Sequence, residues 1–87
     1  MSKIDYHLWH GGDGYTDIDV YYSVGEREWR MRMYRDSETL QIVAPTYEYA
    51  PTKHDSFERV KRIPKRVQAY FDSVVEKAKV ILILGDD

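Results

Sequence analysis

Hydrophobic and polar residues alternate through the middle of this chain in a pattern typical of β-strands. From Thr16 to Arg35 the alternation fits one hairpin about a two-residue turn at Gly25-Glu26, where the leading glycine suits a type II′ turn. The apolar face of this hairpin pairs Ile18 with Met33, Val20 with Met31, and Tyr22 with Trp29. The other face pairs Asp19 with Arg32 and Tyr21 with Arg30, which are favourable contacts. Both faces therefore predict the same register. A slip of one residue would turn the apolar side chains toward water, so no neighbouring register fits the pattern.

Two further strands extend the hairpin into a meander. Residues 38–44 continue it if Asp36-Ser37 forms the turn, which sets Leu40 opposite Met33, Ile42 opposite Met31 and Ala44 opposite Trp29. Upstream, a loop through residues 10–14 would set Leu8 against Ile18 and Tyr6 against Val20. The pattern therefore predicts a four-stranded antiparallel sheet in sequential order.

The C-terminal third is predicted to be largely helical. Residues 46–54 have no sustained period and are interpreted as a loop, after which Asp55 could cap a short helix that ends at Arg62. Pro64 suits the first turn of a second helix, whose apolar face is formed by Val67, Tyr70, Phe71, Val74, Val75 and Ala78. Residues 80–84 fit either a continuation of that helix, with Gly85 ending it, or a buried fifth strand. Residues 1–87 thus form a single α+β domain, a meander sheet packed by an amphipathic helix.

Composition narrows the classes of function. The 87-residue chain has a formal net charge of −2, which argues against both a strongly basic nucleic-acid binder and a heavily acidic DNA mimic. Without cysteine it has no disulfide, thiolate zinc site or cysteine nucleophile. Residues 1–14 lack the apolar core of a signal peptide, and the apolar run at residues 80–84 is too short to span a bilayer. We therefore expect a cytoplasmic protein with no membrane association.

One candidate binding surface is the sheet face that the helix leaves open. Its predicted rows run Trp9, Asp17, Tyr34, Thr39; then His7, Asp19, Arg32, Gln41; then Asp5, Tyr21, Arg30, Val43. The candidate binding residues among them are Trp9, Tyr21, Arg30, Arg32 and Tyr34. These residue types form hot spots in protein interfaces, and they also stack on single-stranded bases. The carboxylates in the rows would repel phosphate, which favours a protein partner. The alternative is a solvated sheet face stabilised by cross-strand ion pairs, or a face covered by residues 46–54.

A second candidate surface is a cluster of five cations near the start of the main helix. The cluster contains Arg59, Lys61, Arg62, Lys65 and Arg66. Cations in the first helical turn oppose the helix macrodipole, which favours acidic residues there. Such a helix start could take an anionic partner, whether acidic protein or phosphate. The alternative is an ordinary solvated junction between helices.

The sequence contains no complete set of catalytic residues or metal ligands. His7 and Asp19 could supply a base and its orienting group, but Ser23 lies too far along the strand to be activated by His7. His7, His10 and Asp19 could bind a transition metal only if the strand ends at Trp9, because His7 and His10 otherwise point to opposite faces of the strand. The loop before Asp17 resembles a calcium loop only at Asp13-Gly14, because most of the required ligand positions lack oxygen side chains. We expect no enzyme activity, cofactor or bound metal.

The sequence therefore leads to a small non-enzymatic module that binds another protein. Compact domains of this kind are frequent among phage and mobile-element proteins that inhibit host complexes, so an inhibitor or adaptor is the leading hypothesis. The alternative is a nucleic-acid-binding protein that uses the Arg/Tyr sheet face or the basic helix start. A homodimer formed through residues 80–84 is also left open.

Overall fold

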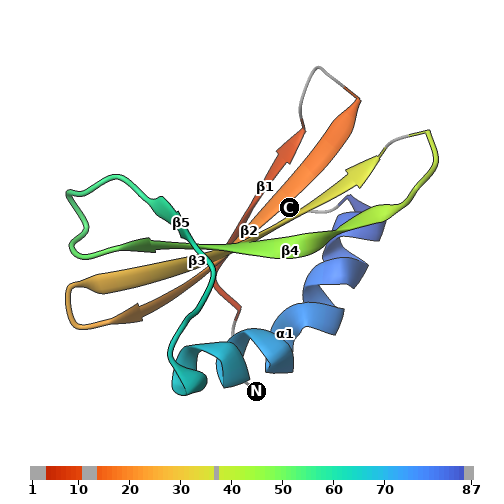
Figure 1. The fold of residues 1–87 in the computed structure, drawn as a ribbon. Helices are drawn as coiled ribbons and strands as arrows, with labels where there is room; N and C mark the ends of the chain where they lie inside the picture. Colours follow the sequence, from red (N-terminus) through yellow and green to blue (C-terminus); the bar gives the residue numbers. More distant parts are fainter. Residues whose placement is uncertain (1–3, 11–13, 37, 86–87) are drawn as a thin grey trace.

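In the part of the chain that the structure describes, five strands form one antiparallel sheet with one helix against it (Figure 1). The computed structural model describes residues 4–10, 14–36 and 38–85. The elements are β1 (Tyr6–His10), β2 (Tyr15–Val24), β3 (Arg27–Asp36), β4 (Ile42–Ala50), β5 (Glu58–Val60) and α1 (Lys65–Leu84). Neighbouring strands in the sheet are consecutive in the chain. The predicted α+β class and sequential antiparallel topology are thus confirmed, with five strands in place of four.

The predicted register of the first three strands is confirmed. β2 and β3 pair Ile18 with Met33, Val20 with Met31, Tyr22 with Trp29, Asp19 with Arg32 and Tyr21 with Arg30. β1 pairs Leu8 with Ile18 and Tyr6 with Val20. At the hairpin turn the positive φ of 61° falls on Gly25, as a type II′ turn requires. Part of the loop between β1 and β2, residues 11–13, lies outside the described residues.

β4 begins later and ends later than the predicted strand at residues 38–44. The carboxylate of Asp36 accepts hydrogen bonds from the backbone N–H groups of Glu38 and Thr39 at 2.8 and 3.2 Å, so the chain is still turning there. Leu40 then adopts a positive φ of 63°, and the backbone N–H of Asp36 donates to Gln41 at 2.9 Å. Ser37, part of the predicted turn, lies outside the described residues.

The predicted pairing of the strand at residues 38–44 with β3 is therefore wrong. Tyr47 lies opposite Met31 and Tyr49 lies opposite Trp29, the places predicted for Ile42 and Ala44. The register shifts between Arg32 and Tyr34, where the partner strand contains Pro45. Proline has no N–H to donate to a strand ladder, so an irregular position of this kind accommodates it. Most of the predicted loop at residues 46–54 is consequently strand.

The short helix predicted between Asp55 and Arg62 is also absent, and β5 occupies its place. The Asp55 carboxylate accepts the Thr52 hydroxyl at 2.9 Å, and the Asp55 backbone N–H donates to the Thr52 carbonyl. These bonds close a tight turn instead of capping a helix. Val60 of β5 then pairs with Tyr47. Pro64 restricts Ile63, the residue before it, to extended conformations, so an irregular link joins β5 to α1.

The ambiguous tail is helical, so the alternative of a fifth C-terminal strand is wrong. α1 continues to Leu84, and Gly85 has a left-handed φ of 68° with its N–H bonded to the Ile81 carbonyl at 2.9 Å. This geometry is a common way for a helix to end. At the other end, α1 begins at Lys65, so Lys65 and Arg66 lie in its first turn as expected, and that turn contains no acidic residue.

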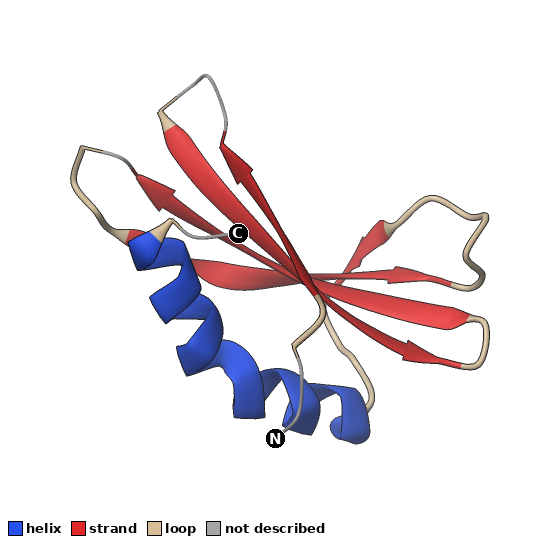
Figure 2. Ribbon diagram, turned by 180° about the vertical axis from the view of Figure 1, so that it is seen from behind, coloured by secondary structure: helices blue, strands red, loops and turns tan. Residues whose placement is uncertain are grey.

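The core lies between α1 and the side of the sheet formed by the apolar hairpin face. Figure 2 shows the helix on that side only of a strongly twisted sheet. The best-buried members are Ile18, Val20, Met31 and Met33 from the sheet, with Val67, Phe71, Ala78 and Leu82 from the helix. Each of these side chains except the methyl group of Ala78 contributes about 1.5–3 kcal/mol when removed from water. The opposite side, which we call the open sheet face, carries no helix formed by the described residues.

Candidate functional site

The open sheet face presents three cross-strand rows of polar and aromatic residues. One row contains Trp9, Asp17, Tyr34 and Val43; the next contains His7, Asp19, Arg32 and Thr46; the third contains Tyr21, Arg30, Glu48 and Arg59. The sequence had placed Thr39, Gln41 and Val43 in the β4 column of these rows, which is wrong because β4 is displaced along β3. Glu48 and Arg59 therefore join a surface where sequence reasoning did not expect them.

Asp19 anchors the middle of this face. Its side chain is only 1% exposed, although it lies on the side away from the helix. Arg32 Nε and Nη2 donate to its two oxygens at 2.6 and 3.0 Å, and Trp9 Nε1 donates to Oδ2 at 3.1 Å. The bond to Asp19 raises the pKa of Arg32 above its usual value. Asp19 thus fixes both an arginine and a tryptophan in single orientations.

Arg30, the other candidate arginine on this face, is also paired. Its Nε donates to Glu48 at 2.8 Å, and its guanidinium lies 4.2 Å from the ring centroid of Phe57. Partial burial alone would lower the pKa of Arg30, but the bond and charge of Glu48 raise it overall. Burial raises the pKa of neighbouring Tyr21, and the charge of Asp19 adds to that shift. Both arginines are therefore already neutralised by carboxylates.

The most exposed apolar groups of the open face lie in the row that crosses β1 to β4. Trp9 and Val43 are each 50% exposed, and Tyr34 between them is half-buried. Tyr15, two residues before Asp17 on β2, is also exposed on this side. The Trp9 ring packs against His7, with 4.0 Å between ring centroids. We call these four residues the aromatic row: Trp9, Tyr34 and Val43 from this row, together with Tyr15 from the adjoining one.

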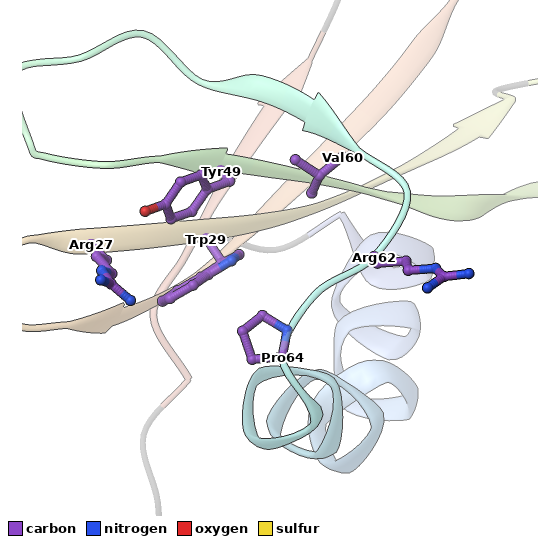
Figure 3. A pocket seen from close by; sticks show the side chains of 6 residues that line it. All are labelled: Arg27, Trp29, Tyr49, Val60, Arg62 and Pro64. Atoms are coloured by element: carbon purple, nitrogen blue, oxygen red, sulfur yellow. The ribbon is translucent and has the colours of Figure 1, made fainter.

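A second feature lies on the helix side, where α1 begins beneath the end of the β2–β3 hairpin. Two adjoining cavities of about 260 and 250 Å³ share Arg27, Trp29 and Pro64 in their walls. Figure 3 shows the first of them, with Trp29 and Pro64 between Arg27 and Arg62. We call the pair the arginine groove; its remaining lining residues are Val24, Tyr49, Val60, Arg62, Arg66 and Val67.

The structure divides the five cations that the sequence had grouped. Arg62 and Arg66 line the arginine groove, whereas Arg59 lies opposite Glu48 on the open sheet face. Lys61 and Lys65 are exposed and line neither cavity. Sequence reasoning missed Arg27, which follows the hairpin turn at residues 25–26. Arg27 lies near α1 only because of where the helix packs against the sheet. No pattern in the sequence predicts that packing position.

The remaining sequence hypotheses concern catalysis, metal binding and membranes. Ser23 donates to Glu28 at 3.1 Å, and His7 packs on Trp9. Among the described residues, no group of three His, Asp or Glu side chains is placed to hold a metal ion. Asp13 of the calcium-like loop lies outside the described residues. No helix within residues 4–10, 14–36 and 38–85 is long and apolar enough to cross a membrane.

Comparison of the chain with models of known protein families, with curated protein sequences and with solved structures gives no match.

Proposed function

We propose that this chain is a small, non-enzymatic protein-binding module that contacts its partner through the aromatic row of the open sheet face. The observation that carries the proposal is the orientation of Trp9. Its indole is half-exposed, yet the hydrogen bond to buried Asp19 and the contact with His7 hold it in place. An aromatic anchor that is already ordered loses little conformational entropy on binding, which is typical of interface hot spots.

The charges of this face favour protein over nucleic acid. Arg30 and Arg32 are bonded to Glu48 and Asp19, so neither offers a free cation to a phosphate group. Nucleic-acid binding depends on unpaired cations that release counterions from the phosphate backbone. A paired, partly buried arginine instead presents a flat, weakly polar surface, which suits contact with a protein. Such a protein-binding surface, without catalytic residues, is sufficient for an inhibitor or adaptor that covers a surface of a larger complex.

Affinity capture with matched variants tests the proposal. The tagged protein is incubated with nuclease-treated lysate of the cells that produce it, and the retained proteins are quantified. We expect a stoichiometric protein partner that Val43→Asp no longer retains, because the new charge lies in the aromatic row. Val80→Asp is the control, since Val80 is 52% exposed but lies on α1. Both variants should keep the wild-type circular dichroism spectrum.

Trp9→Ala should weaken binding of the captured partner by about thirtyfold or more, as expected for a hot-spot tryptophan. Three outcomes would argue against the proposal: retention of nuclease-sensitive material only, full binding by Val43→Asp, or loss of binding by Val80→Asp alone. The first would favour nucleic-acid binding. The last would move the interface to the exposed apolar residues near the end of α1.

A further inference from the structure

Three arginines from three separate elements surround the arginine groove. Arg27 begins β3, Arg62 lies in the link between β5 and α1, and Arg66 is in the first turn of the helix. Within the described part of the chain, none of them forms an ion pair or a side-chain hydrogen bond. They differ in this from Arg30 and Arg32. An anion that enters the groove would therefore meet cations that no carboxylate among the described residues already neutralises.

The floor of the groove is apolar. Trp29 packs against Tyr49 with 5.1 Å between ring centroids, and Val60, Pro64 and Val67 complete the lining. Trp29 is 6% exposed and Val67 is 2% exposed, so the apolar surface that the groove leaves to water belongs mainly to the exposed residues Val24 and Pro64. A bare inorganic anion would not cover that surface. A ligand that fits both parts of the site carries an apolar group for the floor and anionic groups for the rim.

The cations are spread along the groove. Figure 3 shows Arg27 and Arg62 on either side of Trp29 and Pro64, with the Arg62 side chain directed away from Trp29. Separated cations suit a chain with separated anions better than a single compact phosphate. Carboxylates of aspartate and glutamate match the planar guanidinium group and can form two parallel hydrogen bonds with it.

We propose that the arginine groove binds an acidic peptide segment, in which carboxylates pair with Arg27, Arg62 and Arg66 and an apolar side chain covers Pro64 and the exposed edge of Trp29. The site lies on the helix side of the sheet, so it does not depend on the aromatic row. It gives the protein a second surface, selective for chains that combine acidic and apolar residues.

Fluorescence anisotropy with a dye-labelled peptide that alternates glutamate and leucine tests the site directly. We expect saturable binding that each of Arg27→Gln, Arg62→Gln and Arg66→Gln weakens by about five- to tenfold, and that the triple variant weakens by about a hundredfold or more. Arg59→Gln is the matched control. It removes a cation from the same stretch of sequence, but on the open sheet face. All four arginines are exposed, so the variants should fold.

A second readout locates the peptide. The chain has two tryptophans, so in Trp9→Phe the indole of Trp29 is the only one left. Adding the unlabelled peptide should change the emission of Trp29, and a peptide with glutamine in place of glutamate should have no effect.

Three results would overturn the assignment: binding unchanged in the triple variant, equal weakening by Arg59→Gln, or Trp29 emission that does not respond to a bound peptide. A dye-labelled single-stranded oligonucleotide of the same length forms the last arm. If it binds more tightly than the peptide and loses affinity in the same arginine variants, the groove is a nucleic-acid site and the acidic-peptide assignment is wrong.

Discussion

Asp19 is buried on the open sheet face because three hydrogen bonds replace the water that its carboxylate loses. Two come from Arg32 and one from Trp9. A buried charge of this kind contributes little net stability while its partners are in place, but removing one partner is costly. Its main effect here is on geometry, because one carboxylate orients both a cation and an exposed aromatic ring.

Asp19→Asn should lower the free energy of unfolding by about 2 kcal/mol, because Arg32 loses its counter-ion while remaining partly buried. Glu48→Gln provides the comparison. Glu48 is 17% exposed, so water can replace part of the interaction, and we expect a loss of about 1 kcal/mol or less. Urea denaturation of both variants measures the difference. Equal losses would mean that the burial of Asp19 is not what makes its pair costly to break.

Two half-buried tyrosines should make stability fall at alkaline pH. Burial raises the pKa of Tyr21 and of Tyr70, with further contributions from Asp19 and Asp5 respectively. The folded state therefore holds these phenol protons more tightly than the unfolded chain. Their contribution is fully present below the ordinary pKa of 10.0 and is lost as pH rises through the raised values.

Replacing both tyrosines by phenylalanine removes these protons from the balance. We expect the free energy of unfolding, measured in urea between about pH 8 and about pH 11, to fall less steeply in the double variant Tyr21→Phe, Tyr70→Phe than in the wild-type protein. An alkaline slope that stays the same would show that other groups cause the loss of stability.

The connection between β3 and β4 contains a backbone conformation that its residue disfavours. Leu40 has a φ of 63° and a side chain that is 61% exposed. Left-handed φ values cost a leucine roughly 1 kcal/mol, whereas asparagine adopts them more readily. Leu40→Asn should therefore raise the midpoint of urea denaturation. Leu40→Ala is the control, because it removes the apolar side chain without easing the backbone. A gain of the same size in both would attribute the effect to solvation.

For a strand or helix, prediction from the sequence succeeded where many residue positions independently required the same register. The β2–β3 hairpin was predictable because apolar pairs on one face and charged pairs on the other required the same register. β4 was not, since Asp36 prolongs the turn through side-chain bonds and Pro45 introduces an irregularity. Neither effect appears in a pattern of alternation. The helix tail was ambiguous because Val80–Leu84 suits both states, and packing of Leu82 in the core favours the helix.

The candidate sites were likewise predictable only where they depend on strand register. The residues of the open face on β1, β2 and β3 were predictable from register alone, whereas their β4 neighbours were not. The arginine groove required tertiary structure, because Arg27 and Arg66 come together only when α1 docks beneath the hairpin. Sequence proximity had instead grouped Arg59 with Arg62, although their side chains serve different surfaces.

The whole molecule therefore has two separate candidate surfaces. The aromatic row lies on the open sheet face, and the arginine groove lies on the helix side near the other end of β3. Within the described residues, the sheet ends at β1 and at the three-residue β5, where exposed Glu58 and Arg59 discourage a further strand from pairing. Residues 80–84, once a candidate dimer edge, belong to the helix and offer no strand edge.

Because these surfaces share no side chain, changes in one should leave binding at the other intact. We expect Val43→Asp to bind the glutamate-leucine peptide within about twofold of the wild-type affinity, since distant sites are nearly additive. Arg27→Gln should likewise retain the partner captured through the aromatic row. If either variant impairs both kinds of binding while its circular dichroism spectrum and urea midpoint stay unchanged, the two surfaces are coupled through the sheet. Loss of both together with a lowered midpoint would instead trace the effect to the fold that the surfaces share.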